Sequence, residues 1–235
     1  MSHQSKVPTT SGELDNVSPL GNLGVNILTP KITELLVPIV GTSRLVSHAW
    51  DQKAINMMLD KQKGKAVPKK APKDPEADFK ASLYQSTEGW YGFPAVAFKQ
   101  AAVAACRFCD NSVKMNIARG IIFVQPDGYT ENGHDIVRID GDEPVMRQDM
   151  VRIGMGTADI RYRGEFRNWS ANLKVRVNAN ILSPEHIYNL FELAGHHVGI
   201  GEGRPGAPKT SMDWGMFRTN LEVQAIADLP VEKAA

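Results

Sequence analysis

The sequence has little of three things that would mark particular protein classes: cysteine, long apolar runs and net charge. Only two of its 235 residues are cysteines, Cys106 and Cys109, too few for a disulfide framework or a four-cysteine zinc site. No stretch approaches the ~18–20 apolar residues of a membrane span, and residues 1–15 lack the basic-then-apolar order of a secretory signal. We therefore expect a cytoplasmic protein with no membrane partner, no metal site and no cofactor.

Charge is almost balanced over the whole chain, with 27 Lys and Arg against 26 Asp and Glu. Such a balance gives no overall electrostatic attraction to nucleic acid. Binding of nucleic acid would therefore have to come from local clusters of basic residues. The 42% of apolar and 23% of charged residues are typical of a globular domain. We expect one domain over residues 30–227, between a flexible N-terminal arm (1–29), rich in small polar residues, and a C-terminal tail (228–235).

The first basic cluster lies in residues 61–80, where seven lysines face three acidic residues, a net charge of +4. Because three prolines and a glycine interrupt the same segment, we expect a long mobile loop rather than a helix or an inner strand. The segment is either a solvated surface loop or a basic insertion that contacts phosphate.

Local patterns predict an alternation of strands and helices over the rest of the chain. The period-two alternation of 171–177 predicts a strand with Leu173, Val175 and Val177 on a buried face. The predicted strands are 32–40, 118–125, 136–139, 151–154, 161–166, 171–177 and 216–223. The predicted helices are 53–61, an alanine-rich and mostly buried helix opened by Pro94, and a helix with Ser183 as N-cap, Pro184 at its first position and Gly195 at its end.

The second basic cluster lies in residues 152–176, with six basic residues against two acidic ones, again +4. Its strand pattern predicts a basic sheet face formed by Arg161, Arg163, Arg167, Lys174 and Arg176. Trp169 and Tyr162 could stack on bases beside this face. The alternative is a set of solvated strand residues with no ligand.

Residues 195–215 hold six glycines together with Arg204 and Lys209. Glycines permit positive φ and close backbone approach, so such a loop can present N–H groups to phosphate. The loop follows a helix and precedes a strand, which is the opposite of a dinucleotide-binding fingerprint. The alternative is a tight connection that needs glycine for its geometry alone.

The last part of the chain has a predicted helix, the glycine-rich loop, Gly215-Met216-Phe217 and a final strand. Before it come the 32–40 strand and the segment 92–99, which leads into the alanine-rich helix. In this order of its predicted elements, the chain resembles the RAMP superfamily of CRISPR effector subunits. Within it, the chain is similar to members carried by tailed phages. The resemblance covers roughly residues 32–223. It implies an α+β, ferredoxin-like β-α-β-β-α-β fold, here with a long basic insertion, and backbone-type subunits that stack along single-stranded RNA.

Histidine is the residue on which RNA-processing members of that superfamily usually rely as a general base. Five of the six histidines lie within residues 32–223, and of these His196 and His197 beside the glycine-rich loop are the candidates for catalysis. A pair in that position more often packs a helix end. Cys106 and Cys109 are better explained as core residues than as zinc ligands. We therefore expect no enzymatic activity.

The sequence thus predicts non-catalytic, largely sequence-independent binding of single-stranded RNA or DNA, RNA favoured, by a homo-oligomer or filament. Two alternatives stay open: a structural or interaction protein, such as an assembly subunit or a mimic of CRISPR backbone subunits, and a metal-independent ribonuclease. The predicted nucleic-acid contacts are Lys61, Lys63, Lys65, Lys69, Lys70, Lys99, Arg161, Arg163, Arg167, Trp169, Lys174, Arg176, Arg204 and Lys209.

Overall fold

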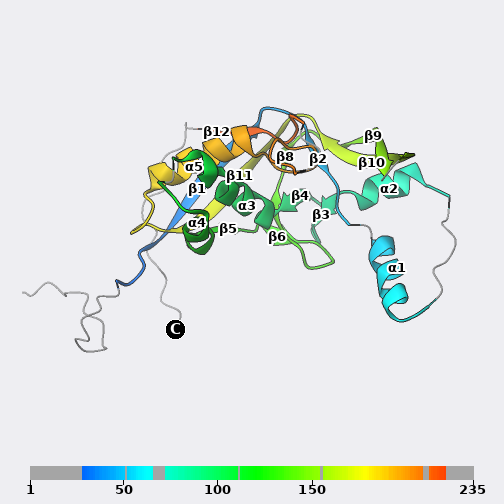
Figure 1. Ribbon diagram of the computed structural model, residues 1–235, viewed down its shortest axis with the longest axis horizontal. Helices are drawn as coiled ribbons and strands as arrows, with labels where there is room; N and C mark the ends of the chain where they lie inside the picture. The colour runs from blue at the N-terminus through cyan, green and yellow to red at the C-terminus, as the bar shows by residue number, and fades with distance from the viewer. Residues whose placement is uncertain are drawn as a thin grey trace, which may run out of the picture.

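The computed structural model describes residues 28–50, 52–65, 72–110, 112–153, 156–208 and 212–220, and these form a mixed α and β structure (Figure 1). Its helices are α1 (Gln52–Gln62), α2 (Pro75–Ala81), α3 (Ala95–Ala105), the short 3-10 helix η1 (Cys106–Phe108), α4 (Met115–Ile121) and α5 (Pro184–His197). Its strands are β1 (Ile32–Gly41), β2 (Leu45–Ser47), β3 (Tyr84–Gln85), β4 (Tyr91–Pro94), β5 (Ile122–Gln125), β6 (Gly128–Tyr129), β7 (Asp135–Arg138), β8 (Asp140–Gly141), β9 (Val145–Ile153), β10 (Thr157–Phe166), β11 (Trp169–Asn178) and β12 (Phe217–Thr219). No helix of the described part is both long and apolar enough to span a bilayer.

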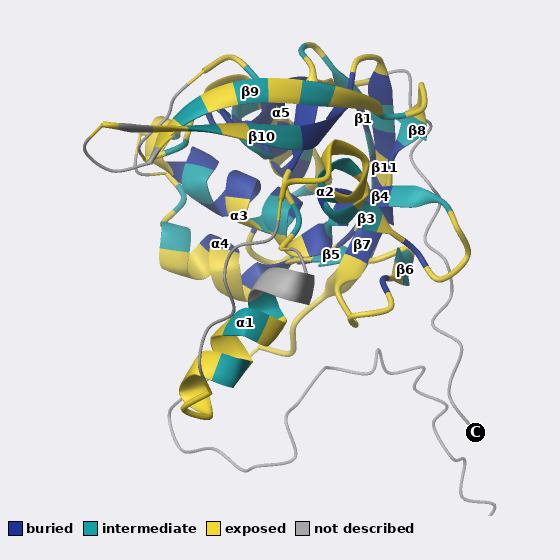
Figure 2. Ribbon diagram, turned by 90° about the vertical axis from the view of Figure 1, so that its right-hand side faces the viewer, coloured by how far each residue is buried: buried dark blue, intermediate teal, exposed yellow. Residues whose placement is uncertain are grey.

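The largest sheet, sheet A, has the strand order β12-β1-β11-β5, with β8 paired to the start of β11. All its neighbouring strands are antiparallel. The predicted alternation of β11 is confirmed, since Leu173, Val175 and Val177 are buried while Lys174 and Arg176 are exposed. Helices α3 and α5 cover the buried face, where their side chains join one core with β1 and β11 (Figure 2).

Two smaller sheets complete the structure. Sheet B has the order β2-β10-β9, and sheet C has the order β3-β4-β7-β6. Helix α2 packs beside β10, where the Ser82 hydroxyl accepts a hydrogen bond of 2.8 Å from the backbone N–H of Gly164. A side chain at Gly164 would collide with Leu83, so glycine lets α2 lie close to the strand. Sheet B, α1 and α2 thus form the end of the molecule opposite α4 and α5 (Figure 1).

The start of α5 is as predicted, but its end is not. Ser183 is the N-cap and accepts from the N–H of His186, and Pro184 takes the first position. Gly195 does not stop the helix, which runs two residues further to His197. Its role is close packing: a Cβ there would lie 1.9 Å from the carbonyl oxygen of Phe217 in β12. The chain turns instead at Gly199, whose φ is +66°.

The expectation that residues 61–80 form an irregular loop throughout is wrong at both ends. Helix α1 continues to Gln62, and α2 occupies the end of the segment. The Asp74 carboxylate caps α2 by accepting from the N–H groups of Glu76 and Ala77 at 3.1 and 3.2 Å. Pro75 stands at the first position of α2, where its missing N–H costs no hydrogen bond. The middle of the segment, 66–71, lies outside the described residues.

The predicted strand 118–125 is also corrected, because its first half is helical. Helix α4 includes Ala118 and Ile121, both buried in the core, and β5 begins only at Ile122. The β-branched and aromatic residues 122–124 do form a strand, whereas Ala118 and Arg119 are good helix formers and belong to α4. The N-terminal arm up to residue 27, the tail 228–235 and the final strand beyond Asn220 lie outside the described residues.

Substitution of Gly195 by Ala tests the contact between α5 and β12. We expect G195A to lower the free energy of unfolding by roughly 1–3 kcal/mol, because the new methyl group overlaps the β12 backbone. The matched control is G120A in α4, where no atom lies within 4 Å of a Cβ. There alanine should be neutral or stabilise by about 0.5–1 kcal/mol. Equal effects of both variants in urea titrations would contradict the packing.

Candidate functional site

The glycine-rich loop between α5 and β12 has a backbone that only glycine adopts readily. Gly201 and Gly203 have φ of +79° and +64°. A Cβ at Gly201 would lie 2.7 Å from the carbonyl oxygen of Val46 in β2, and one at Gly203 would lie 2.5 Å from the ring of Trp214. Within the described ranges, neither the N–H of Gly201 nor that of Gly203 has a hydrogen-bond acceptor. Both donors therefore lack a described acceptor, although Gly203 is buried and Gly201 is half-buried.

A cleft of about 670 Å³ lies between this loop and helix α3. The helix contributes small side chains and Gln100 to its lining. Two guanidinium groups line it. Arg107 is exposed, and Arg204 is held at the loop because its Nη1 donates to the carbonyl oxygen of Gly201 at 3.0 Å. The volume suits a nucleotide-sized ligand, and the donors present suit an anion.

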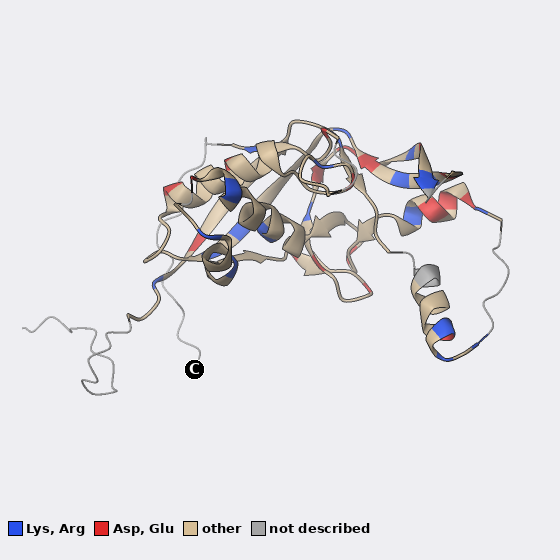
Figure 3. Ribbon diagram, in the orientation of Figure 1, with Lys and Arg blue, Asp and Glu red and all other residues tan. Residues whose placement is uncertain are grey.

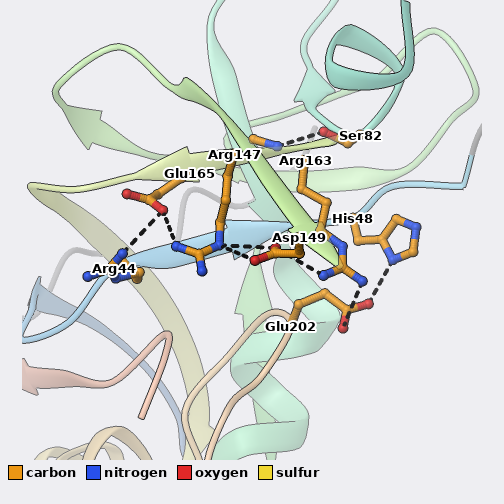
Figure 4. Close-up of polar contacts among 9 residues, drawn as sticks. Arg44, His48, Ser82, Arg147, Asp149, Arg163, Glu165 and Glu202 are labelled. Carbon is orange, nitrogen blue, oxygen red and sulfur yellow. Dashed lines mark hydrogen bonds and ion pairs between the residues drawn. The ribbon is translucent and has the colours of Figure 1, made fainter. Parts of the chain in front are cut away.

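Beneath the loop, β9 and β10 of sheet B carry a buried network of ion pairs (Figure 4). Arg147 is 2.8 Å from Glu165 and 2.9 Å from Asp149, and Arg163 is 3.3 Å from Asp149. Only 5% of the Glu165 side chain and 6% of the Arg163 side chain are exposed. Arg44 and Arg167 also contact Glu165, at 3.5 and 3.0 Å, so that carboxylate is compensated from three sides.

Two side-chain contacts join this network to the glycine-rich loop, and one backbone hydrogen bond joins the loop to β2 of the same sheet. Arg163 Nη2 lies 4.0 Å from the Glu202 carboxylate, and the Arg147 guanidinium lies 4.4 Å from the centre of the Trp214 ring. The N–H of Glu202 donates to the carbonyl oxygen of Val46 at 3.0 Å. The position of the loop, and so the shape of the cleft, depends on the charges of sheet B.

Glu202 also pairs with His48, whose Nδ1 lies 2.7 Å from Glu202 Oε1. The hydrogen bond from His48 and the charge of Arg163 hold the pKa of Glu202 below its usual range, although burial opposes them. His48 lines the cleft. Sequence reasoning counted this histidine without singling it out. Its partner is 154 residues away, so no local pattern could have identified the pair.

The predicted basic sheet face does not form, because β10 and β11 belong to different sheets. Lys174 and Arg176 lie on the outer face of sheet A, paired with Asp127 at 2.9 Å and Glu34 at 3.4 Å. Figure 3 shows basic residues at both ends of the molecule rather than on one surface. The other three members lie in or next to sheet B: Arg161 and Arg163 on β10, and Arg167 just after it.

Of the two predicted stacking residues, Trp169 is not at the surface. It is 3% exposed, packs against Gly41, and its Nε1 donates to the carbonyl oxygen of Ser43 at 2.7 Å. The ring is a core residue at the start of β11 and is not accessible to a base. Tyr162 is half-buried and lines a second cleft beside α1.

The remaining predicted residues are dispersed. His196 and His197 are exposed at the end of α5, outside the cleft, and His197 stacks on Phe108 with ring centres 4.3 Å apart. Cys106 is buried and Cys109 half-buried, as expected of core residues. The Lys99 ammonium lies 4.2 Å above the Phe123 ring. Lys61, Lys63 and Lys65 are exposed around the end of α1, whereas Lys69, Lys70 and Lys209 lie outside the described residues.

Substitution of Glu165 by Gln tests the buried network. Removing one partner leaves Arg147 undercompensated in a buried setting, so we expect E165Q to lower the free energy of unfolding by about 3–5 kcal/mol. The control is E34Q, which removes one carboxylate from an exposed pair and should cost less than about 1 kcal/mol. Chemical denaturation at pH 7 measures both. A small effect for both variants would show that the network does not stabilise sheet B.

The same residue gives a pH prediction. Burial alone would raise the pKa of Glu165, but hydrogen bonds from Arg147 and Arg167 and the charge of Arg44 outweigh it and hold the pKa below its usual range. The stabilisation is therefore complete above the unfolded pKa of about 4.3 and is lost as pH falls from there to the lower folded pKa. We expect the stability gap between wild type and E165Q to narrow over this acid range. A constant gap would contradict the lowered pKa.

No family model matches the chain, and no curated protein matches it. Among solved structures, the chain is similar to the crystal structure of Cmr6 from Pyrococcus furiosus. The similarity covers 82% of this chain and all of that chain, with 12% sequence identity and a TM-score of 0.42. At this level a likeness assigns neither activity nor ligand, which leaves the geometry of the cleft as the basis for function.

Proposed function

We propose that the protein binds single-stranded nucleic acid, RNA favoured, without catalysis and largely without sequence preference, and that the cleft between α3 and the glycine-rich loop holds the phosphates. One observation carries the proposal: Gly201 and Gly203, whose N–H groups lack a described acceptor, line a cleft that also holds the guanidinium groups of Arg107 and Arg204. Neighbouring N–H groups in alternating backbone conformations form a concave site for anions.

Electrostatics supports an anion in this cleft despite the near-neutral chain. The carboxylate in its lining, Glu202, is paired with His48 and lies 4.0 Å from Arg163, so its charge is largely compensated. Arg107 makes no ion pair with any described residue. A phosphodiester would therefore meet net positive charge here, and affinity would come mainly from counterion release.

We further propose that sheet A with α3 and α5 is a ferredoxin-like core. The elements β1, α3, β5, β11, α5 and β12 follow one another as β-α-β-β-α-β, and their strands take the order β12-β1-β11-β5. This arrangement supports the resemblance to the RAMP superfamily seen in the sequence, with the glycine-rich loop between the last helix and the last strand. Assembly of several copies along one strand of RNA is part of the same proposal.

Variants at two pairs of basic residues test whether phosphates bind in the cleft or on the outer face of sheet A. The double variant R107Q/R204Q should bind a fluorescein-labelled twelve-residue oligouridylate at least about tenfold more weakly. Its plot of log affinity against log salt should be shallower by about 1.4, because two phosphate contacts to a single strand are lost. The double variant K174Q/R176Q removes the same charge from residues already paired with Asp127 and Glu34, so its affinity should change little.

Fluorescence anisotropy at several salt concentrations measures both variants, and gel analysis of the oligonucleotide reports any cleavage. A larger loss for K174Q/R176Q would place the phosphates on sheet A and overturn the cleft. If wild type binds no oligonucleotide, and its purified assembly carries none, the interaction-protein alternative replaces nucleic-acid binding. Cleavage in EDTA would favour the ribonuclease alternative.

The basic insertion is a separate part of the proposal. Its lysines around the end of α1 are exposed, and only Lys65 has a described partner, Asp60 at 3.1 Å. Replacing the cluster with alanine should weaken binding to every sequence by a similar factor, because phosphate contacts carry no base information. The cluster is Lys61, Lys63, Lys65, Lys69 and Lys70. Two oligonucleotides of different sequence provide the comparison, and unchanged affinity for both would remove the insertion from the binding site.

A further inference from the structure

A second cleft, of about 410 Å³, lies between the segment after β2, helix α1, the end of α2 and strand β10. His48 lines both this cleft and the one beside the glycine-rich loop, so the two meet at that residue. A chain molecule lying in the first cleft can thus continue into the second.

The most exposed aromatic ring among the described residues, Trp50, lines this second cleft and is 66% accessible. Met58 of α1, 44% exposed, lies in the same lining. Leaving a large apolar ring in water forfeits the free energy of burying it, and the described part of the chain offers it no cover. Trp50 is therefore positioned for a flat apolar partner.

The backbone next to Trp50 is fixed, so the ring sits on an anchored segment. The N–H of Ala49 donates to the carbonyl oxygen of Ser82 at 2.9 Å, and the Ser47 hydroxyl donates to the same oxygen at 2.7 Å. Ser82 in turn is bonded to Gly164 of β10. An aromatic side chain on an anchored segment loses little conformational freedom when it binds, which favours stacking.

The charges around the cleft favour a ligand with an anionic part on one side. Arg161 lines the cleft on the β10 side. Its charge is one of those that lower the pKa of Glu202, but no carboxylate of a described residue lies within 4.0 Å of it. Lys73 is held in the wall by Asp159 and the carbonyl oxygen of Ile160. Asp78 is the one carboxylate of the lining, and it comes from α2. A phosphate would therefore lie beside Arg161.

We propose that this second cleft is a nucleobase-binding subsite, in which Trp50 stacks on a base while Arg161 contacts the adjoining phosphate. The inference rests on the proposed function and deepens it, because it assigns the strand a path from the glycine-rich loop past His48 to Trp50. A base with its phosphate fits better than a purely apolar partner, since this cleft continues the cleft proposed for phosphates and the Arg161 guanidinium lines it beside Trp50. Stacking on an aromatic ring tolerates every base, in keeping with binding that ignores sequence.

A double-mutant cycle between the protein and the ligand isolates the stacking contact. The probes are a twelve-residue oligouridylate and a sugar–phosphate oligomer of the same length without bases. W50A should bind the oligouridylate about tenfold more weakly than wild type and the abasic oligomer equally well. W50F, which keeps an aromatic ring, should recover most of the loss. The intrinsic fluorescence of wild type should be quenched by the oligouridylate, and that quenching should be reduced in W50F.

The matched control is W90F, because Trp90, in the connection between β3 and β4, packs against Gly128 and its indole N–H donates to Glu88. It should keep wild-type affinity and quenching. Equal binding of the two oligomers to wild type, or equal losses for both in W50A, overturns the subsite while leaving phosphate binding intact. A W50A variant that changes the oligomeric mass but not the base dependence shows that a second copy occupies the cleft. If neither oligomer binds wild type, the proposed function fails and the subsite with it.

Discussion

Buried charge in sheet B is the constraint on which the candidate site depends. Arg147, Asp149, Arg163 and Glu165 are largely shielded from water, and isolated charges in such a setting cost several kcal/mol each. Each must therefore be paired, which fixes how β9 lies against β10. The Nε atom of Arg163 is buried without a partner in the described part of the chain, so this residue depends on its other nitrogen atoms to reach Asp149 and Glu202.

Through Glu202, the same network decides where the glycine-rich loop lies. The loop approaches β2 so closely that a side chain at Gly201 would collide with the Val46 carbonyl group, and its neighbour Glu202 bonds to that carbonyl. The same short strand leads to His48 and Trp50. Strand β2 is hydrogen-bonded to the loop, and the segment that follows it is hydrogen-bonded to Ser82. The backbone around His48, where the two clefts meet, is therefore held in place.

Local signals in the sequence predicted the elements better than their arrangement. The alternation around Leu173 and the cap at Ser183 depend on a few neighbouring residues, and both predictions are confirmed. The cap at Asp74 is an equally local signal, but the expectation of a loop over 61–80 treats every proline of the segment as a helix breaker and so misses it. Pro75 instead stands at the first position of a helix. The predicted basic face was wrong for a different reason. Alternation along a strand shows which residues share a face, but it does not show to which sheet the strand belongs. Here the turn at 167–168 takes the chain from sheet B to sheet A.

The same reasoning explains why charge clusters along the chain did not locate the candidate site. Among the described residues, four of the six cations of the second cluster are paired with carboxylates, and for three of them, such as Lys174 with Asp127, the carboxylate is distant in sequence. What attracts an anion is a cation left without a carboxylate partner beside backbone donors that lack an acceptor. Among the described residues Arg107 meets that condition at the glycine-rich loop, and Arg161, which has no described carboxylate within 4.0 Å, lines the cleft of Trp50. Neither stands out in the sequence, because pairing is a property of the folded chain. A protein with 27 basic and 26 acidic residues can therefore still present local positive charge, wherever folding leaves a basic side chain without a carboxylate partner.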